Sequence, residues 1–266
     1  MGNRGLGVAL LAIIAAAAAL ASQSGNVKVE RRIAAPEARQ GVASDGRFVY
    51  AIDNQRIGKY AIATGQRVAS WSGDPKHFAH INSCTIVGPE LVCAASNYPA
   101  LPQISSVEFF DVAKLVHRRS VSLGQGPGSL SVIDRHQGKW WAVFANYDGR
   151  GGQPGRDHRA TLLVQMDDAF RAQKSWAFPP TILDRISPNS ISGASWTADG
   201  QLTVAGHSRP ELYVVAVPER GTVLTHVTTI PVATRGQAID WDPRDPKLLW
   251  SIDRKRREIV ASRPKL

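Results

Sequence analysis

The sequence predicts an all-β protein, a β-propeller of about five four-stranded blades. Short β-rich segments alternate with Gly, Pro, Asp and Asn turns, and almost no stretch keeps a 3.6-residue apolar period for long. A strand–turn–strand unit also recurs five times, beginning at residues 41, 81, 128, 192 and 236. The spacings of 40, 47, 64 and 44 residues lie near the length of a WD-type propeller blade, with one oversized unit.

The remaining strands follow in order within each unit. A fourth strand follows the third in the first four units, whereas the chain ends before a fourth strand of the fifth unit. Residues 26–33 can supply that strand, so we expect the N-terminus to close the ring by pairing with the last blade. Six blades are the alternative if the connector at 179–190 hides strands rather than a helical turn. The third strands are expected at 56–62, 105–112, 160–167, 211–217 and 257–263.

The N-terminus has the pattern of a cleaved signal peptide. Arg4 precedes an apolar run at 6–20, and a small-x-small motif ends at Ala21. The run is shorter than the roughly 20 residues of a membrane span, although a retained anchor is the alternative. We therefore expect a signal peptide at 1–21, a single propeller domain at 22–266 with no further membrane span, and a periplasmic or secreted protein.

The two cysteines fit an exported protein. Cys84 and Cys93 flank a strand–turn–strand segment whose turn contains Gly88-Pro89. Pairing the strands about this turn places the two cysteines opposite each other, within reach of a disulfide. In an oxidising compartment such a pair is expected to form a structural disulfide.

The formal net charge of +10 could attract nucleic acid or an anionic envelope surface. The basic residues are scattered along the predicted strands and turns, however, and the one true cluster is at 254–257. We therefore expect no nucleic-acid partner, and a monomer that binds a small molecule or a protein.

Polar side chains follow each apolar second strand, where propeller loops converge at one end of the central channel. The loops that enter the first strands share that face and add further polar residues. Turn chemistry explains many of them, because Asp, Asn and Ser are common turn residues. The candidate ligand-binding residues are Gln40, Asn82, Asn97, Tyr98, Asn146, Asp148, Arg150 and Gln237.

Two histidines stand out on the same predicted face. His80 and His207 lie at matching blade edges, and histidine is not a favoured turn residue. Either can titrate near neutral pH and transfer a proton, so both are the candidate catalytic residues. Arg150 lies in a glycine-rich insertion at 146–159, where it could hold a carboxylate or phosphate.

Four stretches resemble a family of exported bacterial propellers of largely unknown function, across nearly all of residues 22–266. Some members are labelled cycloisomerases, and the family is distantly similar to gluconolactonase and muconate-lactonising propellers. The stretches are SNYPALPQISSVEFFD, WWAVFANYDGRGGQPGR, GHSRPELYV and GQAIDWDP.

The resemblance implies a divalent cation such as Ca²⁺ in the channel, held by oxygen ligands. Asn97, Asn146 and Asp148 are the candidate metal ligands, although the glutamate of the gluconolactonase site has no obvious counterpart. Two functions therefore stay open. The first is binding of a small anionic or sugar-like ligand, or of a protein partner, on the loop face. The alternative is a lactone hydrolase or cycloisomerase.

Overall fold

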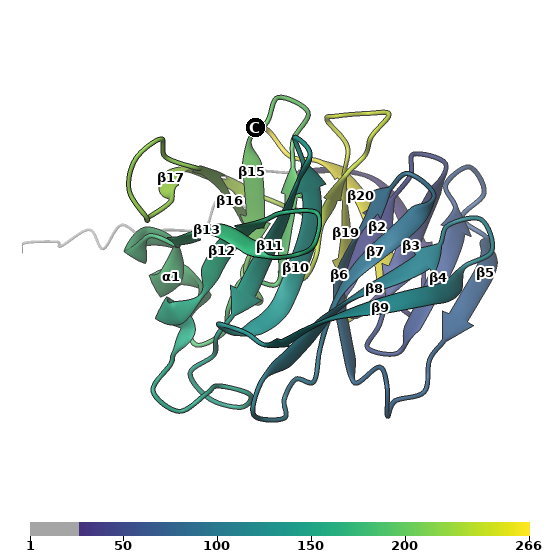
Figure 1. Cartoon of the computed structure of the whole chain (residues 1–266). Coiled ribbons are helices and arrows are strands. Elements are labelled where there is room, and N and C mark those ends of the chain that lie inside the picture. The colour runs from purple at the N-terminus through teal and green to yellow at the C-terminus, as the bar shows by residue number, and fades with distance from the viewer. Residues whose placement is uncertain (1–26) are drawn as a thin grey trace, which may run out of the picture.

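The computed structural model describes residues 27–266, which form five four-stranded antiparallel sheets arranged as a five-bladed propeller (Figure 1). The predicted fold is confirmed, and the 179–190 connector holds the helix α1 (Pro180–Ile186) rather than a sixth blade. The predicted signal peptide lies outside the described residues. No helix within the described part of the chain is long and apolar enough to cross a membrane.

Each blade follows the expected order, with its first strand nearest the axis. Blade 1 contains β2 (Gly41–Ser44), β3 (Phe48–Ile52), β4 (Arg56–Ala61) and β5 (Arg67–Ser72). Blade 2 contains β6 (His80–Val87), β7 (Glu90–Ser96), β8 (Ile104–Asp111) and β9 (Val116–Gln125). Blade 3 contains β10 (Ser129–His136), β11 (Lys139–Ala145), β12 (Leu162–Met166) and β13 (Ala172–Ala177). Blade 4 contains β14 (Gly193–Trp196), β15 (Leu202–Ala205), β16 (Glu211–Ala216) and β17 (Thr225–Pro231).

The fifth blade joins the two ends of the described chain. It contains β18 (Asp240–Trp241), β19 (Leu249–Asp253), β20 (Glu258–Arg263) and, as its outer strand, β1 (Lys28–Ala34). β1 runs antiparallel to β20, as the sequence predicts. The inner strand β18 is shorter than the repeat suggests. Gly236 and Gln237 have positive φ angles, and the Ala238 amide donates to the Gln40 carbonyl of blade 1 instead of extending β18.

The core consists of apolar layers between neighbouring blades. Successive side chains of a strand point to opposite faces, so a central strand contributes to two layers. In β7, Leu91 and Cys93 pack between blades 1 and 2, whereas Val92 and Ala94 pack between blades 2 and 3. The helix α1 adds three buried side chains to the layer between blades 3 and 4. Burial on both faces therefore explains why these strands are nearly continuous apolar runs.

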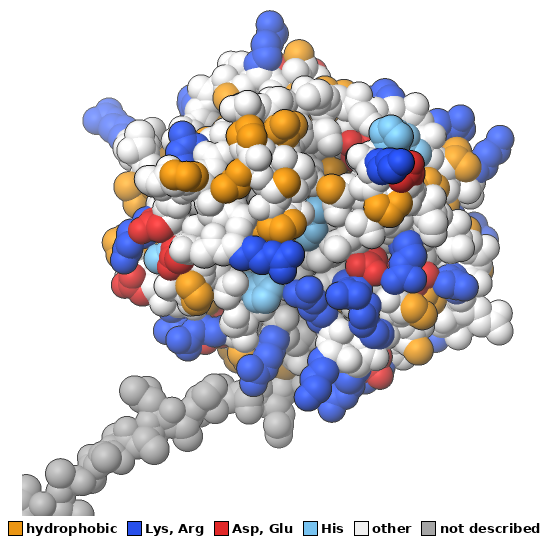
Figure 2. Space-filling model, turned by 90° about the horizontal axis from the view of Figure 1, so that it is seen from below, with side chains coloured by type: hydrophobic (Ala, Val, Ile, Leu, Met, Phe, Trp, Pro, Cys, Tyr) orange, Lys and Arg blue, Asp and Glu red, His pale blue; other side chains and the backbone are white. Residues whose placement is uncertain are grey.

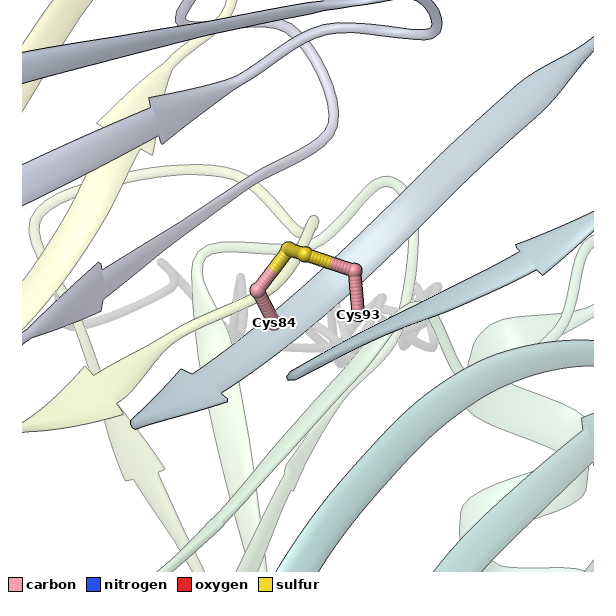
Figure 3. Close-up of a disulfide and its surroundings, with 2 residues drawn as sticks. All are labelled: Cys84 and Cys93. Atoms are coloured by element: carbon pink, nitrogen blue, oxygen red, sulfur yellow. A yellow bond between two sulfur atoms is a disulfide. The ribbon is translucent and has the colours of Figure 1, made fainter. Parts of the chain in front are cut away.

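The predicted disulfide is present between β6 and β7 (Figure 3). Cys84 and Cys93 are directly paired in the strand register, and their Cα atoms are 4.0 Å apart. Both side chains lie in the layer between blades 1 and 2. The bond thus links the inner strand of blade 2 to the next strand of the same blade.

A ring of polar side chains lies near the ends of the inner strands, on the face opposite the loops that follow the second strands. Thr85 donates to Asp134 Oδ1 at 2.9 Å, and the Ser195 hydroxyl donates to Asp240 Oδ1 at 3.1 Å. The Ser44 amide donates to Asp240 Oδ2 at 2.8 Å. Burial raises the pKa of Asp134 to about 6. Burial, together with the charge of Asp134, raises the pKa of Asp240 well above its usual value.

We expect Cys93→Ser to lower the free energy of unfolding by about 2–3 kcal/mol, because the unfolded chain regains the freedom of the loop between the two cysteines. Urea denaturation of the oxidised protein and the variant measures this difference. Reduced wild-type protein is the control, and it should behave like the variant. Equal stability of all three would contradict a structural role for the bond.

We expect Asp134→Asn to stabilise the protein at pH 7.5 by about 1–2 kcal/mol and to have little effect near pH 4. The raised pKa means that the native state favours the protonated acid. The stabilisation that this protonated acid gives the native state is fully present below the pKa of Asp134 in the unfolded chain. It is lost as the pH rises through the native pKa of about 6. Denaturation curves at both pH values measure the effect, with Asp184→Asn on the exposed side of α1 as the control. An equal gain in stability at both pH values would contradict the raised pKa of Asp134.

Candidate functional site

The loops that follow the second strands and those that enter the first strands share one face, as expected from the strand order. Figure 2 shows this face, where Lys and Arg side chains gather around histidines near the centre and hydrophobic side chains gather beside them. A cavity of about 450 Å³ opens here between the loops of blades 4 and 5. Its lining includes His207, Thr234, Arg235, Gln237, Asp253, Arg254, Lys255 and Arg256.

Arg254 is the central cation of this face. It follows β19, is partly buried, and its Nη1 lies 3.3 Å from His207 Nε2 of blade 4. Within the described residues its guanidinium forms no ion pair with a carboxylate, whereas the neighbouring Arg256 pairs with Asp253 at 2.9 Å. Burial lowers the pKa of Arg254, the positive charges of Arg39 and Arg257 lower it further, and the carboxylate of Asp53 offsets part of this effect from beyond ion-pair distance. The mouth of the channel therefore holds a cation whose charge is poorly compensated.

The two candidate catalytic histidines flank this cation. His80 is 8% exposed at the start of β6, and burial followed by the charge of Arg254 lowers its pKa to about 4. The same two causes lower the pKa of His207. The sequence suggested that His80 titrates near neutral pH. With its lowered pKa the imidazole is instead neutral at that pH, because a second positive charge beside Arg254 is unfavourable.

A row of three aromatic side chains begins at His80 and runs across blades 2 and 3. The ring centroids of His80 and Tyr98 are 5.2 Å apart, and those of Tyr98 and Tyr147 are 5.0 Å apart. Gly151 packs against Tyr98 so closely that an added Cβ would lie 2.3 Å from its ring. Gln103 Nε2 donates to the Gly151 carbonyl at 2.7 Å, which ties the glycine-rich insertion to the loop of blade 2.

Three of the predicted amide-bearing residues are buried near the channel mouth. Gln40 donates to Asn54 Oδ1 at 2.7 Å, and Gln237 lines the cavity beside His207. Asn82 donates weakly to the Leu130 carbonyl at 3.4 Å. Gln40, Asn82 and Gln237 therefore surround the entrance to the channel.

Other predicted residues shape the loops. Asn97 closes its own turn by donating to the Pro102 carbonyl and accepting from the Ile104 amide. The buried Asn146 side chain donates to the carbonyls of Pro127 and Ala160. Arg150 is exposed on the insertion.

The candidate metal ligands have different surroundings. One Asp148 oxygen contacts His158 Nδ1 at 2.5 Å, and the other accepts from Ser187 at 3.4 Å. Asp148, Asp157 and His158 offer ligand atoms within 4.8 Å of one another. Asp157 already accepts from the Arg159 amide at the start of the short 3-10 helix His158–Ala160. These three residues belong to the insertion, so they form a group separate from the cavity.

The sequence analysis assigned Arg254 to the basic cluster at 254–257 and did not include it among the candidate ligand-binding residues. The repeat nevertheless contained a signal for Arg254, because it directly follows the second strand of its unit, as Asn97 directly follows β7. Nothing in the sequence indicated that Asp157 and His158 could act as metal ligands, because only the folded insertion brings them close to Asp148.

Comparisons with known proteins support the fold alone. No family model matches the chain, and no curated protein matches it either. The PQQ-bound aldose sugar dehydrogenase from Streptomyces coelicolor is similar over 90% of this chain and 98% of its own, with 12% identity and a TM-score of 0.56. A chain of the mitotic checkpoint complex is similar over 90% of this chain and 92% of its own, with 11% identity and a TM-score of 0.51.

We expect Arg254→Gln to raise the pKa of both His80 and His207, because the repelling charge is removed while the burial stays. NMR titration of the imidazole resonances measures the two values. Arg220→Gln, in the exposed β16–β17 loop on the opposite face, controls for the loss of one positive charge. Unchanged histidine titration in Arg254→Gln would show that the guanidinium does not lie over the channel mouth.

Proposed function

We propose that this protein binds a small anionic ligand at the channel mouth, with Arg254 as its principal contact. The observation that carries the proposal is the partly buried guanidinium, which has no carboxylate partner among the described residues. A cation removed from water is costly unless an anion compensates it. A carboxylate or phosphate fits the planar guanidinium through two parallel hydrogen bonds.

The surroundings of Arg254 favour a ligand that is both anionic and hydroxylated. Gln237 and Thr234 offer an amide and a hydroxyl group within the same cavity. Arg235 and Lys255 are exposed on its rim, where their charges would attract an anion from solution. A hydroxylated carboxylate, whether a sugar acid or a hydroxy-aryl acid, has this combination of groups.

We place this binding activity in the periplasm or outside the cell. The disulfide supports an oxidising compartment, and the pattern at 1–21 supports export. The chain would act there as a monomer.

A second candidate function is lactone hydrolysis or cycloisomerisation. One observation favours it: two imidazoles with lowered pKa values flank a cation, and a neutral imidazole is a competent general base. His207 would accept a proton as an oxyanion develops at Arg254, because the negative charge of the oxyanion offsets the repulsion between the guanidinium and the imidazolium. A divalent cation is the further element of this candidate; of the expected ligands, Asn97 does not fit, because both ends of its amide are used within its own turn. A protein partner is also compatible with the fold, since one similar structure belongs to a protein complex.

Isothermal titration with gluconate, citrate, acetate and phosphate tests the first proposal. We expect saturable binding that weakens as the salt concentration rises, because screening reduces the attraction. Arg254→Gln should weaken binding by about 10–100-fold, the range of a charged hydrogen bond. Arg220→Gln on the opposite face is the matched control and should bind like the wild type.

The same samples separate the alternatives. Binding of the tested anions that is unaffected by Arg254→Gln contradicts the proposal. If no anion in the panel binds, a protein partner becomes the better hypothesis. Turnover of a lactone, together with a stoichiometric divalent cation by metal analysis, would favour the enzyme, and loss of that turnover in His207→Ala would assign the base.

A further inference from the structure

The row of flat side chains beside Arg254 is a feature that anion binding alone does not use. His80 lies within the electrostatic influence of Arg254, and Tyr98 and Tyr147 follow it with centroid separations of 5.2 and 5.0 Å. Both tyrosines are partly exposed. A ligand bound at Arg254 would therefore find aromatic surface on the side of the mouth formed by blades 2 and 3.

The position of Tyr98 is set by its neighbours. Gly151 has a φ angle of +79° and lies against the ring, and the Gln103 side chain holds the Gly151 carbonyl at 2.7 Å. Gln103 is only 1% exposed, so this link is shielded from water. The aromatic surface is thus held in place before any ligand arrives, which reduces the entropy lost on binding.

The apolar surface continues outward along the loop of blade 2. Leu101 is 48% exposed and Ile104 is 43% exposed, next to the prolines at 99 and 102. Figure 2 shows hydrophobic side chains gathered on this face beside the basic ones. Cationic and apolar surfaces therefore adjoin at the channel mouth, and together they match a ligand with a charged head and a flat apolar body.

We infer that the ligand class is an aryl carboxylate, with its carboxylate at Arg254 and its aromatic body against Tyr98. The inference rests on the proposed anion site and adds the identity of the ligand body. Tyr98 determines specificity, since an offset or edge-to-face pair of aromatic rings gains energy beyond the area it buries, whereas a saturated ring gains only from that area. Arg254 supplies the charge recognition that all carboxylates share.

Titration of the purified protein with four probes tests this ligand class. Acetate presents the carboxylate alone, cyclohexanecarboxylate adds a saturated ring, and benzoate adds an aromatic ring. Benzyl alcohol has the aromatic ring without the charge. We expect benzoate to bind about fivefold more tightly than cyclohexanecarboxylate and at least tenfold more tightly than acetate. Benzyl alcohol should bind much more weakly than benzoate, because it cannot pair with Arg254.

Two substitutions at one position assign the preference. Tyr98→Leu should reduce the ratio of benzoate to cyclohexanecarboxylate affinity to about one, whereas Tyr98→Phe keeps the ring and should keep the ratio. Thermal melting of both variants checks that they are folded. If Tyr98→Leu does not fold, the probe series on the wild type and on Tyr98→Phe still tests the preference for a planar body.

The outcomes separate this inference from the proposed function. Equal affinity for benzoate, cyclohexanecarboxylate and acetate, all lost in Arg254→Gln, would overturn the aryl class and leave the anion site intact. A benzoate preference that survives in Tyr98→Leu would overturn the role of Tyr98. No binding of any of the three carboxylates would overturn the aryl class, and the gluconate, citrate and phosphate titrations would then decide whether the anion site stands.

Discussion

The pairing of β1 with β20 is the constraint on which the rest of the structure depends. Every blade packs both of its faces against neighbours, and a last blade without β1 would leave the apolar layer between blades 5 and 1 open. The N-terminal strand completes that blade and buries Ile33 in the layer between blades 5 and 1. Because the ring is closed, the five inner strands stay close to one axis, and the loops at each end converge on small areas.

The two ends of the channel hold different kinds of buried ionisable groups. At one end Asp134 and Asp240 lie close enough to raise the pKa of Asp240, and hydroxyl groups and backbone amides are their hydrogen-bond donors. At the other end Arg254 keeps its charge while His80 loses the tendency to become protonated. Burial penalises both kinds of charge, but the carboxylate can escape by binding a proton and the guanidinium cannot.

The repeat predicted which residues would surround the mouth because equivalent positions in a propeller meet at one end of the axis. Of these residues, His207 and Gln237 line the cavity, and Gln40, His80 and Asn82 are buried at or just before the start of first strands. The repeat could not separate those residues from Asn97 and Asn146, whose side chains hold their own loops. Both groups contain polar residues after apolar strands. Which carbonyl or amide each side chain meets depends on the path of loops that lack a repeating pattern.

The sequence by itself determined the five blades, the ring closure and the Cys84–Cys93 pair, because each follows from local alternation, turn chemistry and repeat spacing. Only the tertiary structure decided that Arg254 is the central cation and that His80 is neutral. Both properties arise from groups contributed by several blades, namely Arg39, Arg257 and His207 around Arg254, and Arg254 beside His80. Electrostatic energies depend on distance and burial in space, and the order of residues along the chain contains neither.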